Sequence, residues 1–524
     1  MDTYEWVLLI AYFSVVGTLA VYGSHRYQMV FLYYKHKRHE PRPRRQFPDD
    51  RLPKVTVQLP VFNEMYVVER LIDTVARLDY PRDRLEIQVL DDSLDETTAI
   101  ARRKSEEWRA KGLDIHFIHR TNRKGFKAGA LEEGLALAAG ELVAIFDADF
   151  TPEPDMLRKT VHFFTDPQVG LVQTRWGHLN NDFSLLTEVQ GIGLDGHLMI
   201  EQTARNRSGR FFNFNGTGGI WRRTAIEQGG GWHHDTLTED LDLSFRAQLK
   251  GWKFVFLPHV VSPAELPVDI TAYKTQQHRW TKGAVQCARK LLPAIWKSDI
   301  PLKCKIEATF QLTMNSAYVL MVLLSILMLP AVTVRFERDW LGYILIDIPF
   351  FFAATTSVFT FYVASQREAY PRDWWKRLKY VPFVVSVGIG MCLSNAKAVL
   401  EGWFGEEGEF VRTPKHGITS TDAASRSTWQ SKKYTGFKSL LPVLELAFGT
   451  YFIFVLWTAV QNGRYLTLPF LGLFVFGFFY VAFLSLAHSR DRAVGAGLSG
   501  PSAEDDDEET TVPRYVTEKV DIAV

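Results

Sequence analysis

The chain has 524 residues and a formal net charge of +1, with 60 basic residues against 59 acidic ones. This length leaves room for about two to four domains, and the near-zero charge argues against nucleic-acid binding. The three cysteines, Cys287, Cys304 and Cys392, lie far apart in the sequence, so they form neither a zinc-ligand spacing nor a disulfide framework and indicate a reducing compartment.

Five long apolar stretches indicate a multi-pass integral membrane protein. Each can form a helix of roughly the 20 residues that cross a hydrocarbon core, and they are residues 6–24, 308–334, 340–366, 439–463 and 465–487. The first stretch differs from a cleaved signal peptide, because its leading end is acidic and its basic cluster follows it.

A sixth apolar run, residues 380–396, is at the lower limit of spanning length. Basic residues flank it on both sides, and positive charge favours the cytoplasmic face. We therefore predict an interfacial or re-entrant segment, with a sixth span as the alternative. The N-terminus then lies outside, whereas the basic segment 35–45, the polar domain and the C-terminal tail lie inside.

The remaining sequence divides into four parts. We predict an N-terminal transmembrane helix over 1–32, a polar domain with interfacial helices over 33–300, a second transmembrane region over 301–488 and a disordered acidic tail over 489–524. The candidate interfacial helices are residues 185–199 and 270–296. Their apolar spacing is also typical of ordinary helices that face a core.

Short apolar runs alternate with helix-length amphipathic segments in the polar domain. The runs are KVTVQLPVF, LEIQVLDDS, IHFIHR and ELVAIFDADF. This alternation predicts a Rossmann-like α/β fold with a parallel sheet whose strands are buried on both faces. Ligands of such sheets bind outside the carboxyl ends of the strands, where this sequence places acidic residues.

The acidic pair Asp147 and Asp149 follows the fourth apolar run, in FDADF. Two carboxylates at a strand end suit Mg²⁺ or Mn²⁺ held against substrate phosphates. A solvated acidic pair is the alternative.

Polar side chains after the other runs are candidates for the remainder of a nucleotide site. Glu64, Asp91 and Asp92 can accept hydrogen bonds from a base or ribose, although an aspartate at a turn can equally be a cap. Lys127, at a predicted helix start, is a candidate phosphate ligand or a surface lysine. The glycines of FNFNGTGG match no dinucleotide fingerprint, and no Walker motif is present.

Two further segments carry candidate catalytic and binding residues. Glu239 and Asp240 follow Thr238 in TLTEDL, where an acidic residue is either a general base or a favoured first-turn residue of a helix. In TQQHRWTKG, Gln276 and Arg279 can hold a pyrophosphate and Trp280 offers an apolar face for a sugar ring. A core tryptophan beside a surface arginine is the alternative.

In this order, LDDSLDET, DADF, TED and QQHRW resemble the D, DxD, TED and QxxRW motifs of processive family 2 glycosyltransferases, which include cellulose, hyaluronan and chitin synthases. The strings VQTRWGHLN, FNGTGGIWRR and LKGWKF look most like the cellulose synthase-like A group, the mannan and glucomannan synthases. The resemblance covers residues 50–300 strongly and the membrane arrangement more loosely. It implies a GT-A glycosyltransferase domain.

The resemblance also implies a role for each matching position. Asp91 or Asp92 with Glu64 would contact the nucleoside, and Asp147 with Asp149 would hold the diphosphate and its Mg²⁺ or Mn²⁺. Asp240, beside Glu239, would activate the acceptor hydroxyl. The other expected contacts are Lys127, Gln276 and Arg279 to the donor, and Trp280, Asn215 and Gly216 to the acceptor.

FVRTPK, residues 410–415, looks like the FxVTxK gating loop of cellulose synthases, in a predicted loop over 406–420. Phe410, Arg412, Thr413 and Lys415 would lie over the nucleotide, with Arg412 standing where the motif has valine. The loop must share the side of the catalytic domain.

The implied function is polymerisation of a β-1,4-mannan, glucomannan or β-glucan by inverting, processive transfer, with translocation of the growing polysaccharide. The donor would be GDP-mannose, GDP-glucose or UDP-glucose, and no motif selects among them. The expected location is an inner or plasma membrane with the catalytic domain in the cytoplasm. Alternatives are a non-processive lipid glycosyltransferase resembling ceramide glucosyltransferase, and a transporter or scaffold that only binds nucleotide.

Overall fold

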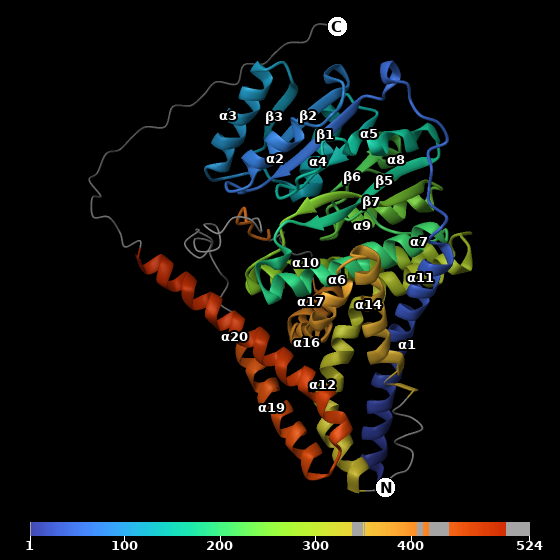
Figure 1. Ribbon diagram of the computed structural model, residues 1–524, viewed down its shortest axis with the longest axis vertical. Coiled ribbons are helices and arrows are strands. Elements are labelled where there is room, and N and C mark those ends of the chain that lie inside the picture. The colour runs from blue at the N-terminus through green and yellow to red at the C-terminus, as the bar shows by residue number, and fades with distance from the viewer. Residues whose placement is uncertain (1, 338–348, 351, 406–411, 419–439, 499–524) are drawn as a thin grey trace.

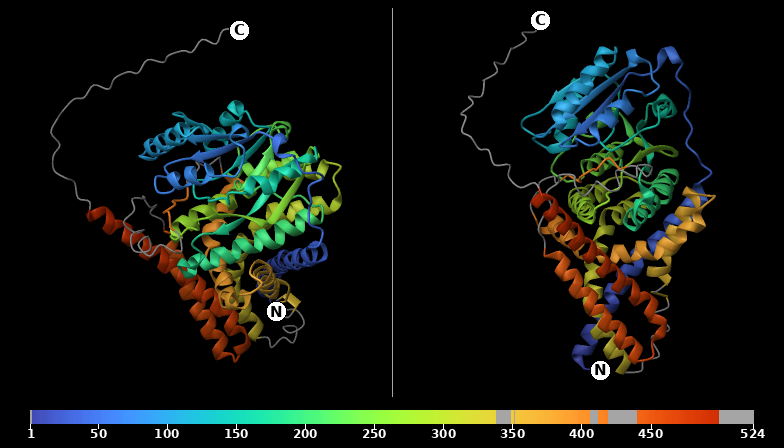
Figure 2. Two further views of the ribbon diagram at one scale, coloured as in Figure 1. Left: turned by 45° about the horizontal axis from the view of Figure 1, so that its top comes forward. Right: turned by 60° about the vertical axis from the view of Figure 1, so that its left-hand side comes forward.

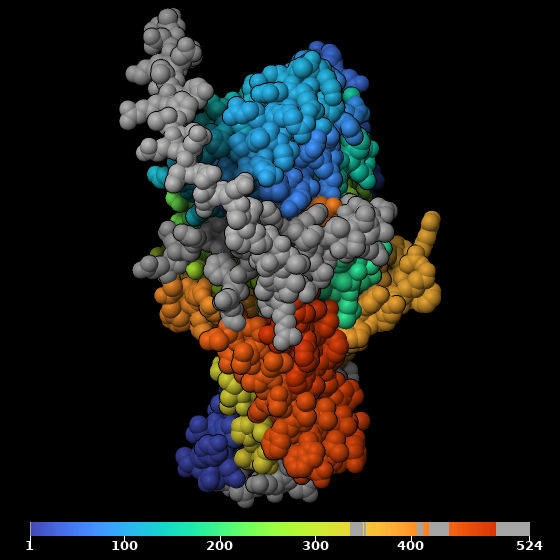
Figure 3. All heavy atoms as spheres, turned by 90° about the vertical axis from the view of Figure 1, so that its left-hand side faces the viewer, coloured from blue at the N-terminus to red at the C-terminus, as the bar shows by residue number. Residues whose placement is uncertain are grey.

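A computed structural model of the chain describes residues 2–337, 349–350, 352–405, 412–418 and 440–498. An α/β domain occupies one end, and long helices extend from its lower side (Figure 1). The space-filling view shows these helices as a narrower stalk beneath the domain (Figure 3).

The α/β domain contains a seven-stranded sheet with strand order β3-β2-β1-β4-β6-β5-β7. The strands are β1 (Val55–Val61), β2 (Leu85–Asp91), β3 (Asp114–His119), β4 (Leu142–Ile145), β5 (Val169–His178), β6 (Gly219–Arg222) and β7 (Lys253–Ala264). The first four strands are parallel, as predicted, and form the four apolar runs. The sheet as a whole is mixed, because β6 is antiparallel to both β4 and β5.

The prediction that every strand is buried on both faces is wrong for β3. This strand pairs only with β2, and only Ile115 of its residues is buried, as expected of an edge strand that is partly exposed to solvent. By contrast, every residue of β2 and β4 is buried. The Rossmann-like class is confirmed, with a mixed second half that the apolar runs do not reveal.

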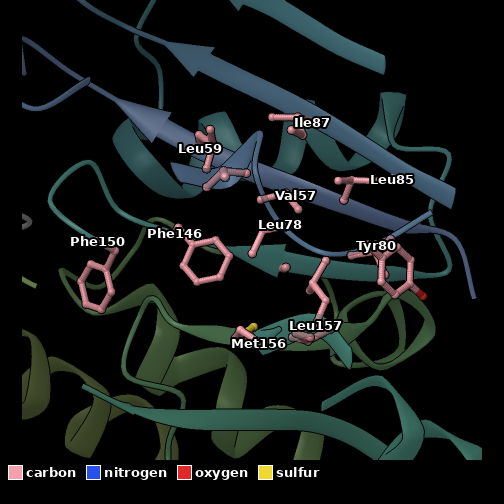
Figure 4. Close-up of a cluster of buried hydrophobic side chains, with 14 of the residues drawn as sticks. Val57, Leu59, Leu78, Tyr80, Leu85, Ile87, Phe146, Phe150, Met156 and Leu157 are labelled. Atoms are coloured by element: carbon pink, nitrogen blue, oxygen red, sulfur yellow. The ribbon is translucent and has the colours of Figure 1, made fainter. Parts of the chain in front are cut away.

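Helices cover both faces of the sheet. They are α2 (Val68–Val75), α3 (Thr97–Ala110), α4 (Phe126–Leu137), α5 (Met156–Val161), α8 (Arg223–Gln228) and α9 (Glu239–Leu249). One buried cluster joins Val57 and Leu59 of β1 to Ile87 of β2 and to Phe146 and Met156 (Figure 4). Each fully buried side chain of this size contributes roughly 1.5–3 kcal/mol, so the cluster fixes the carboxyl ends of β1 and β4 relative to each other.

A second layer of helices lies between the sheet and the stalk (Figure 1). It contains α6 (Leu185–Asp195), the π-helical η5 (Gly196–Gln202), α7 (Thr203–Arg207) and α10 (Ile270–Lys297). The two segments predicted as interfacial helices are therefore helical, and they separate the sheet from the apolar bundle. Lys274 of α10 donates to Glu445 of the bundle at 2.6 Å and to Ser485 at 2.8 Å, and Glu445 is fully buried.

The stalk consists of apolar helices. They are α1 (Thr3–His36), α11 (Leu302–Thr313), α12 (Ala317–Glu337), η7 (Phe352–Thr356), α14 (Ser357–Ala369), α15 (Trp374–Arg377), α16 (Val381–Gly390), α17 (Cys392–Phe404), α19 (Leu441–Gln461) and α20 (Leu468–Leu498). Figure 2 shows α1 running beside α12 and α14, and α19 beside α20. The remaining short helices are η1 (Asp49–Arg51), η2 (Arg82–Arg84), η3 (His162–Thr165), η4 (Asn181–Phe183), η6 (Met314–Ser316), η8 (Leu378–Tyr380) and η10 (Tyr465–Thr467).

Four stretches among the described residues are long and apolar enough to cross a membrane: Thr3–His36, Leu302–Arg335, Leu441–Gln461 and Tyr465–His488. They correspond to four of the five predicted spans: three of these lie entirely within a stretch, and the span 439–463 extends two residues beyond Leu441–Gln461 at each end. The other predicted span, 340–366, lies partly outside the described residues and ends in η7 and α14. A bent pair, Trp374–Gly390 with Cys392–Phe404, turns by 49° and contains the run 380–396. This bend is the geometry of either a broken span or a re-entrant loop.

The predicted tail boundary at residue 489 falls inside a helix. Helix α20 continues to Leu498, beyond the end of its apolar stretch. Residues 499–524, with the acidic run, lie outside the described residues.

Candidate active site

A cleft lies at the carboxyl ends of the parallel strands, where the sheet faces α10. It brings together most of the site residues predicted from the sequence: Glu64, Asp92, Lys127, Asp147, Asp149, Asn215, Gly216, Glu239, Asp240, Gln276, Arg279, Trp280, Arg412, Thr413 and Lys415. Asp91 does not line the cleft, and Phe410 lies outside the described residues.

The two carboxylates that follow β4 each receive a lysine. Lys127 Nζ donates to Asp147 Oδ1 at 2.5 Å and to the Gly216 carbonyl at 2.9 Å, and Lys415 Nζ donates to Asp149 Oδ2 at 2.7 Å. The loop around Gly216 approaches this end because Thr217 Oγ1 accepts the Asp147 N–H at 2.9 Å. Asp147, Glu239 and Asp240 together outweigh burial and raise the pKa of Lys127, so its ammonium stays charged.

These carboxylates fit a divalent cation. Their oxygens are the hard ligands that Mg²⁺ and Mn²⁺ prefer. Among the described residues, each carboxylate uses one oxygen in a side-chain hydrogen bond and leaves the other for a further ligand. A divalent cation bound by these carboxylates would lie beside the ammonium groups of Lys127 and Lys415.

A second acidic group, His233, Asp235 and Asp242, has ligand atoms close enough to hold a metal ion. However, Lys290 Nζ lies 2.8 Å from Asp235 and 3.0 Å from Asp242. The group is therefore neutralised by a lysine, and it lies outside the cleft.

The two aspartates at the end of β2 have different roles. Asp91 is fully buried and accepts from the Ser93 N–H at 3.1 Å and the Thr98 hydroxyl at 2.8 Å, and its carboxylate also contacts His119. These internal bonds give Asp91 the turn-forming role that the sequence left open. Asp92 lines the cleft and is held by two hydrogen bonds from Arg120, at 2.7 and 2.5 Å.

An aromatic and cationic face adjoins Asp92. The guanidinium of Arg123 lies 3.4 Å from the centre of the Phe62 ring and 5.0 Å from that of Phe126, and all three side chains line the cleft. A flat face of this kind is suited to stacking with a base. The sequence motifs gave no role to these three residues, whose only signal was their position at or shortly after the ends of predicted strands.

Asp240 begins α9 on the opposite wall of the cleft. Its carboxylate accepts the Leu241 N–H at 2.8 Å, and no described residue forms an ion pair with it. Burial, reinforced by the neighbouring charge of Glu239 and opposed by Lys127, raises the pKa of Asp240 to about 7. A carboxylate with this pKa is suited to general-base catalysis near neutral pH.

Helix α10 is packed tightly against the loop that precedes Asp240. A Cβ atom on Gly283 would lie 2.6 Å from the Thr238 side chain, so only glycine permits this approach. Gln286 accepts the Leu237 N–H at 2.9 Å. This contact brings Gln276, Arg279 and Trp280 to the same cleft as Asp240. Burial lowers the pKa of Arg279, and four acidic residues oppose that effect.

Trp280 lies beside a second tryptophan. The ring centres of Trp176 and Trp280 are 6.3 Å apart, with the planes inclined at 49°, and both line the cleft. Trp176 lies near the carboxyl end of β5 and donates its indole N–H to the Thr217 carbonyl at 3.2 Å. The position of Trp176 near the end of an apolar run was the one sign in the sequence that it could face the ligand, and no role was predicted for it.

The described part of the gating-like segment, residues 412–418, lies inside the cleft. Arg412 is 3.2 Å from Glu64, and Lys415 reaches Asp149. Burial raises the pKa of Glu64 to about 8, against the lowering effect of Arg412 and Lys415. Glu265, which the sequence analysis missed, anchors this segment by accepting the N–H groups of His416 and Gly417 at 2.9 and 2.8 Å.

Comparison with known proteins gives the same assignment as the motifs. Residues 53–283 match the family model described as "Glycosyltransferase like family 2". The chain is 35% identical over 414 residues to glucomannan 4-beta-mannosyltransferase 9 of Arabidopsis thaliana, an alignment that covers 77% of this chain and 75% of that protein. These findings confirm the family resemblance drawn from the sequence.

Two other relatives match over shorter lengths. Glucomannan 4-beta-mannosyltransferase 1 of Oryza sativa subsp. japonica is 46% identical over 248 residues, covering 46% of this chain and 48% of that protein. Glucomannan 4-beta-mannosyltransferase 2 of A. thaliana is 46% identical over 248 residues, covering 46% of each. In these two alignments the chain spans about half the length of its relatives.

Among solved structures, the chain is similar to the mannosyltransferase PcManGT from Pyrobaculum calidifontis in complex with GDP-Man and Mn²⁺. The TM-score is 0.49 and the identity is 23%, with 68% of this chain and 99% of that chain covered.

Proposed function

Because the chain belongs to glycosyltransferase family 2, we propose that it extends a β-1,4-linked mannan or glucomannan from a nucleotide sugar and passes the product through its own membrane helices. The names of the relatives, glucomannan 4-beta-mannosyltransferases, support this product class. They also favour GDP-mannose as the donor, ahead of GDP-glucose and UDP-glucose.

The donor lies between the carboxylate end of the cleft and α10. Phe62, Arg123 and Asp92 hold the nucleoside, while Lys127 and Arg279 face the diphosphate. Asp147 and Asp149 hold a divalent cation, which supplies positive charge to the diphosphate when it is bound. Support comes from the carboxylate oxygens directed into the cleft and from the basic groups around them.

Transfer is a single displacement with Asp240 as the general base. Asp240 takes the proton of the acceptor hydroxyl, and the acceptor oxygen forms a bond to the anomeric carbon. The bond from that carbon to the phosphate oxygen breaks, and its electron pair leaves with the nucleoside diphosphate. Gln276 and Arg279 hold the leaving pyrophosphate. Attack opposite the leaving group converts an α-linked donor into a β-linked product.

Trp280 and Trp176 form the acceptor end of the site. Aromatic faces pack against the axial C–H surface of a pyranose ring, and the polar loop at Asn215 and Gly216 faces the same space. Glu239 lies beside the base and raises its pKa. An acceptor held in this way is positioned for repeated addition.

We further propose that residues 33–300 form the catalytic domain and lie in the cytoplasm, with 301–488 forming the channel region. The four candidate spans and the bent pair support a multi-pass arrangement. The basic segment after α1 supports a cytoplasmic position for the domain.

The observation that carries the proposal is the meeting of Asp149, Asp240, Arg279 and Trp280 in one cleft. The test is turnover by the purified full chain in nanodiscs, with GDP-mannose, GDP-glucose, UDP-glucose and UDP-N-acetylglucosamine supplied separately with Mg²⁺ or Mn²⁺. We expect nucleotide release and a long β-linked product with GDP-mannose. Release of nucleotide with one sugar attached to a lipid would replace the proposal with the lipid glycosyltransferase alternative.

A further inference from the structure

A basic cavity lies at the C-terminal end of α1, outside the candidate active site. Its volume is about 450 Å³, it is open to solvent on one side, and it is lined by the end of α1, the chain that follows it, η5, α7, β7 and the end of α14. Figure 1 shows α7 beside this end of α1. The charged side chains that line the cavity are Lys37, Arg38, Arg42 and Arg207 together with Glu40 and Glu368.

Arg207 contributes a buried cation whose charge is incompletely balanced. Its side chain is 4% exposed, it donates to the Lys37 carbonyl, and its closest carboxylate oxygen, on Glu40, is 3.8 Å away. The Nε–H is buried and has no hydrogen-bond partner. Burial lowers the pKa of Arg207, and Glu40 opposes this effect. A buried guanidinium with an unmet donor and a distant counter-ion favours an additional anion.

The other cations of the cavity leave a positive excess. Lys37 is paired with Glu368, at 3.1 Å, which also accepts from the Tyr33 hydroxyl at 2.8 Å. Arg38 and Arg42 are exposed, and neither forms an ion pair with a described residue. Four cations against two carboxylates leave two positive charges around a cavity large enough for a phosphate group.

The cavity lies at the depth where lipid headgroups are expected. The candidate span Thr3–His36 ends immediately before its first lining cations. Phe31 is 62% exposed in the last turns of α1, and Lys35 Nζ lies 5.7 Å from its ring centre. Tyr34 is 39% exposed and carries Lys37 Nζ 4.8 Å above its ring. Exposed aromatic residues below lysines are typical of the boundary between acyl chains and headgroups.

We propose that this cavity binds the phosphate-bearing headgroup of an anionic phospholipid, with the acyl chains lying along the exposed aromatic face of α1. The phosphate is held by Arg207 at the base of the cavity and by Arg38 and Arg42 at its rim. The bound lipid thereby ties the end of α1 to α7 and β7 of the catalytic domain. The proposal does not depend on the identity of the donor sugar.

The test uses the purified full chain in a neutral detergent. The midpoint of thermal unfolding is measured as dioleoyl phosphatidylglycerol is added, and the apparent dissociation constant is taken from the rise in midpoint. Parallel titrations use dioleoyl phosphatidylcholine and free glycerol 3-phosphate. The double variant Arg38→Gln/Arg42→Gln removes two exposed cations of the cavity. The matched control, Arg372→Gln/Lys379→Gln, removes two exposed cations near η8 that do not line it.

We expect phosphatidylglycerol to raise the midpoint of the wild-type chain and phosphatidylcholine to leave it unchanged. The cavity variant should bind phosphatidylglycerol about 100-fold more weakly, because it removes two charged hydrogen bonds to phosphate and each contributes on the order of tenfold, while the control variant binds as the wild type does. An equal effect of glycerol 3-phosphate would identify a free-phosphate site and overturn the lipid assignment. Equal losses in the two double variants, or no response of the wild type, would also overturn the proposal.

Discussion

Asp147, Asp149 and Asp92 at the donor end of the cleft differ from Asp240 at the acceptor end in whether a basic side chain pairs with the carboxylate. At the donor end, Asp147, Asp149 and Asp92 each contact a basic side chain at 2.7 Å or less. At the acceptor end, Asp240 is half-buried without an ion pair among the described residues, and desolvation raises its pKa to about 7. A carboxylate that holds a cation serves through its oxygens as ligands, whereas a general base must be able to take up a proton. The two environments provide these two properties within one cavity.

The sharpest test of this comparison is Asp240→Asn. An asparagine has similar size but cannot accept the proton, so we expect kcat to fall about 1,000-fold. Donor binding should remain within about twofold of the wild type, since the donor end is unaltered. Calorimetric titration with GDP-mannose and single-turnover rates give the two quantities. Unchanged turnover would remove Asp240 from the role of base.

At the donor end, the corresponding test is Asp149→Asn. Loss of one of two carboxylate ligands should weaken Mn²⁺ binding by about 100-fold, which electron paramagnetic resonance of free Mn²⁺ measures directly. Glu153→Gln is the control, because Glu153 is an exposed acidic residue shortly after the same strand, paired with Lys159. A variant that binds Mn²⁺ normally would show that Asp149 is not a ligand.

Below about pH 7 the pH dependence of kcat/KM reports the acceptor end, because the other cleft carboxylate with a raised pKa, Glu64, has a pKa of about 8 and changes its protonation mainly above that range. Because burial raises the pKa of Asp240 to about 7, the base is protonated below that pH, and kcat/KM should fall about tenfold for each further pH unit. The effect on folding has the same origin: the contribution of Asp240 to stability is greatest below its unfolded pKa and is lost as the pH rises through about 7. A profile that is flat from pH 8 to pH 5.5 would contradict this assignment.

The smallest expected effect concerns Lys415, whose ammonium donates to the Asp149 carboxylate at 2.7 Å. In Lys415→Gln, the donor-free protein should bind Mn²⁺ about fivefold more tightly, because a competing cation is gone. KM for the donor should rise at the same time, because the cation facing the diphosphate is also gone. Lys159→Gln is the control on an exposed lysine. If Mn²⁺ binding became weaker while the donor KM rose, Lys415 would not compete with the metal ion. If Mn²⁺ binding became tighter while the donor KM fell, Lys415 would not bind the diphosphate.

The first half of the sheet could be predicted because β1, β2 and β4 are continuous apolar runs. The antiparallel β6 has only four residues within the glycine-rich FNGTGGIWRR, which carries no periodicity of its own. Its direction depends on pairing with β4 and β5, and that pairing is a tertiary property. Similarly, the apolar run of β3 is typical of an inner strand. Its position at the edge of the sheet follows from the strand order, which the run itself does not reveal.

The charged motifs of the site could be recognised in the sequence because carboxylates that follow predicted strands usually bind a metal ion, contact a ligand or cap a turn. The residues that were missed act through contacts between distant segments. Glu265 holds residues 416 and 417 through their backbone N–H groups, so the side chains of that segment carry no sign of it. Asp91 and Asp92 are equivalent in sequence, and only the directions of Arg120 and His119 separate them.

The Lys274–Glu445 contact limits how a polymer can be advanced. The lysine is on the helix that carries Arg279 and Trp280, and its partner is fully buried in the stalk. Separating a buried ion pair costs about 3–5 kcal/mol, and the close approach of Gly283 to Thr238 holds the same helix against the loop that precedes Asp240. We therefore expect helix α10 to keep its position relative to the stalk during catalysis. The movement that advances the polysaccharide by one sugar would then come from the substrate itself or from another element, such as the segment containing Lys415.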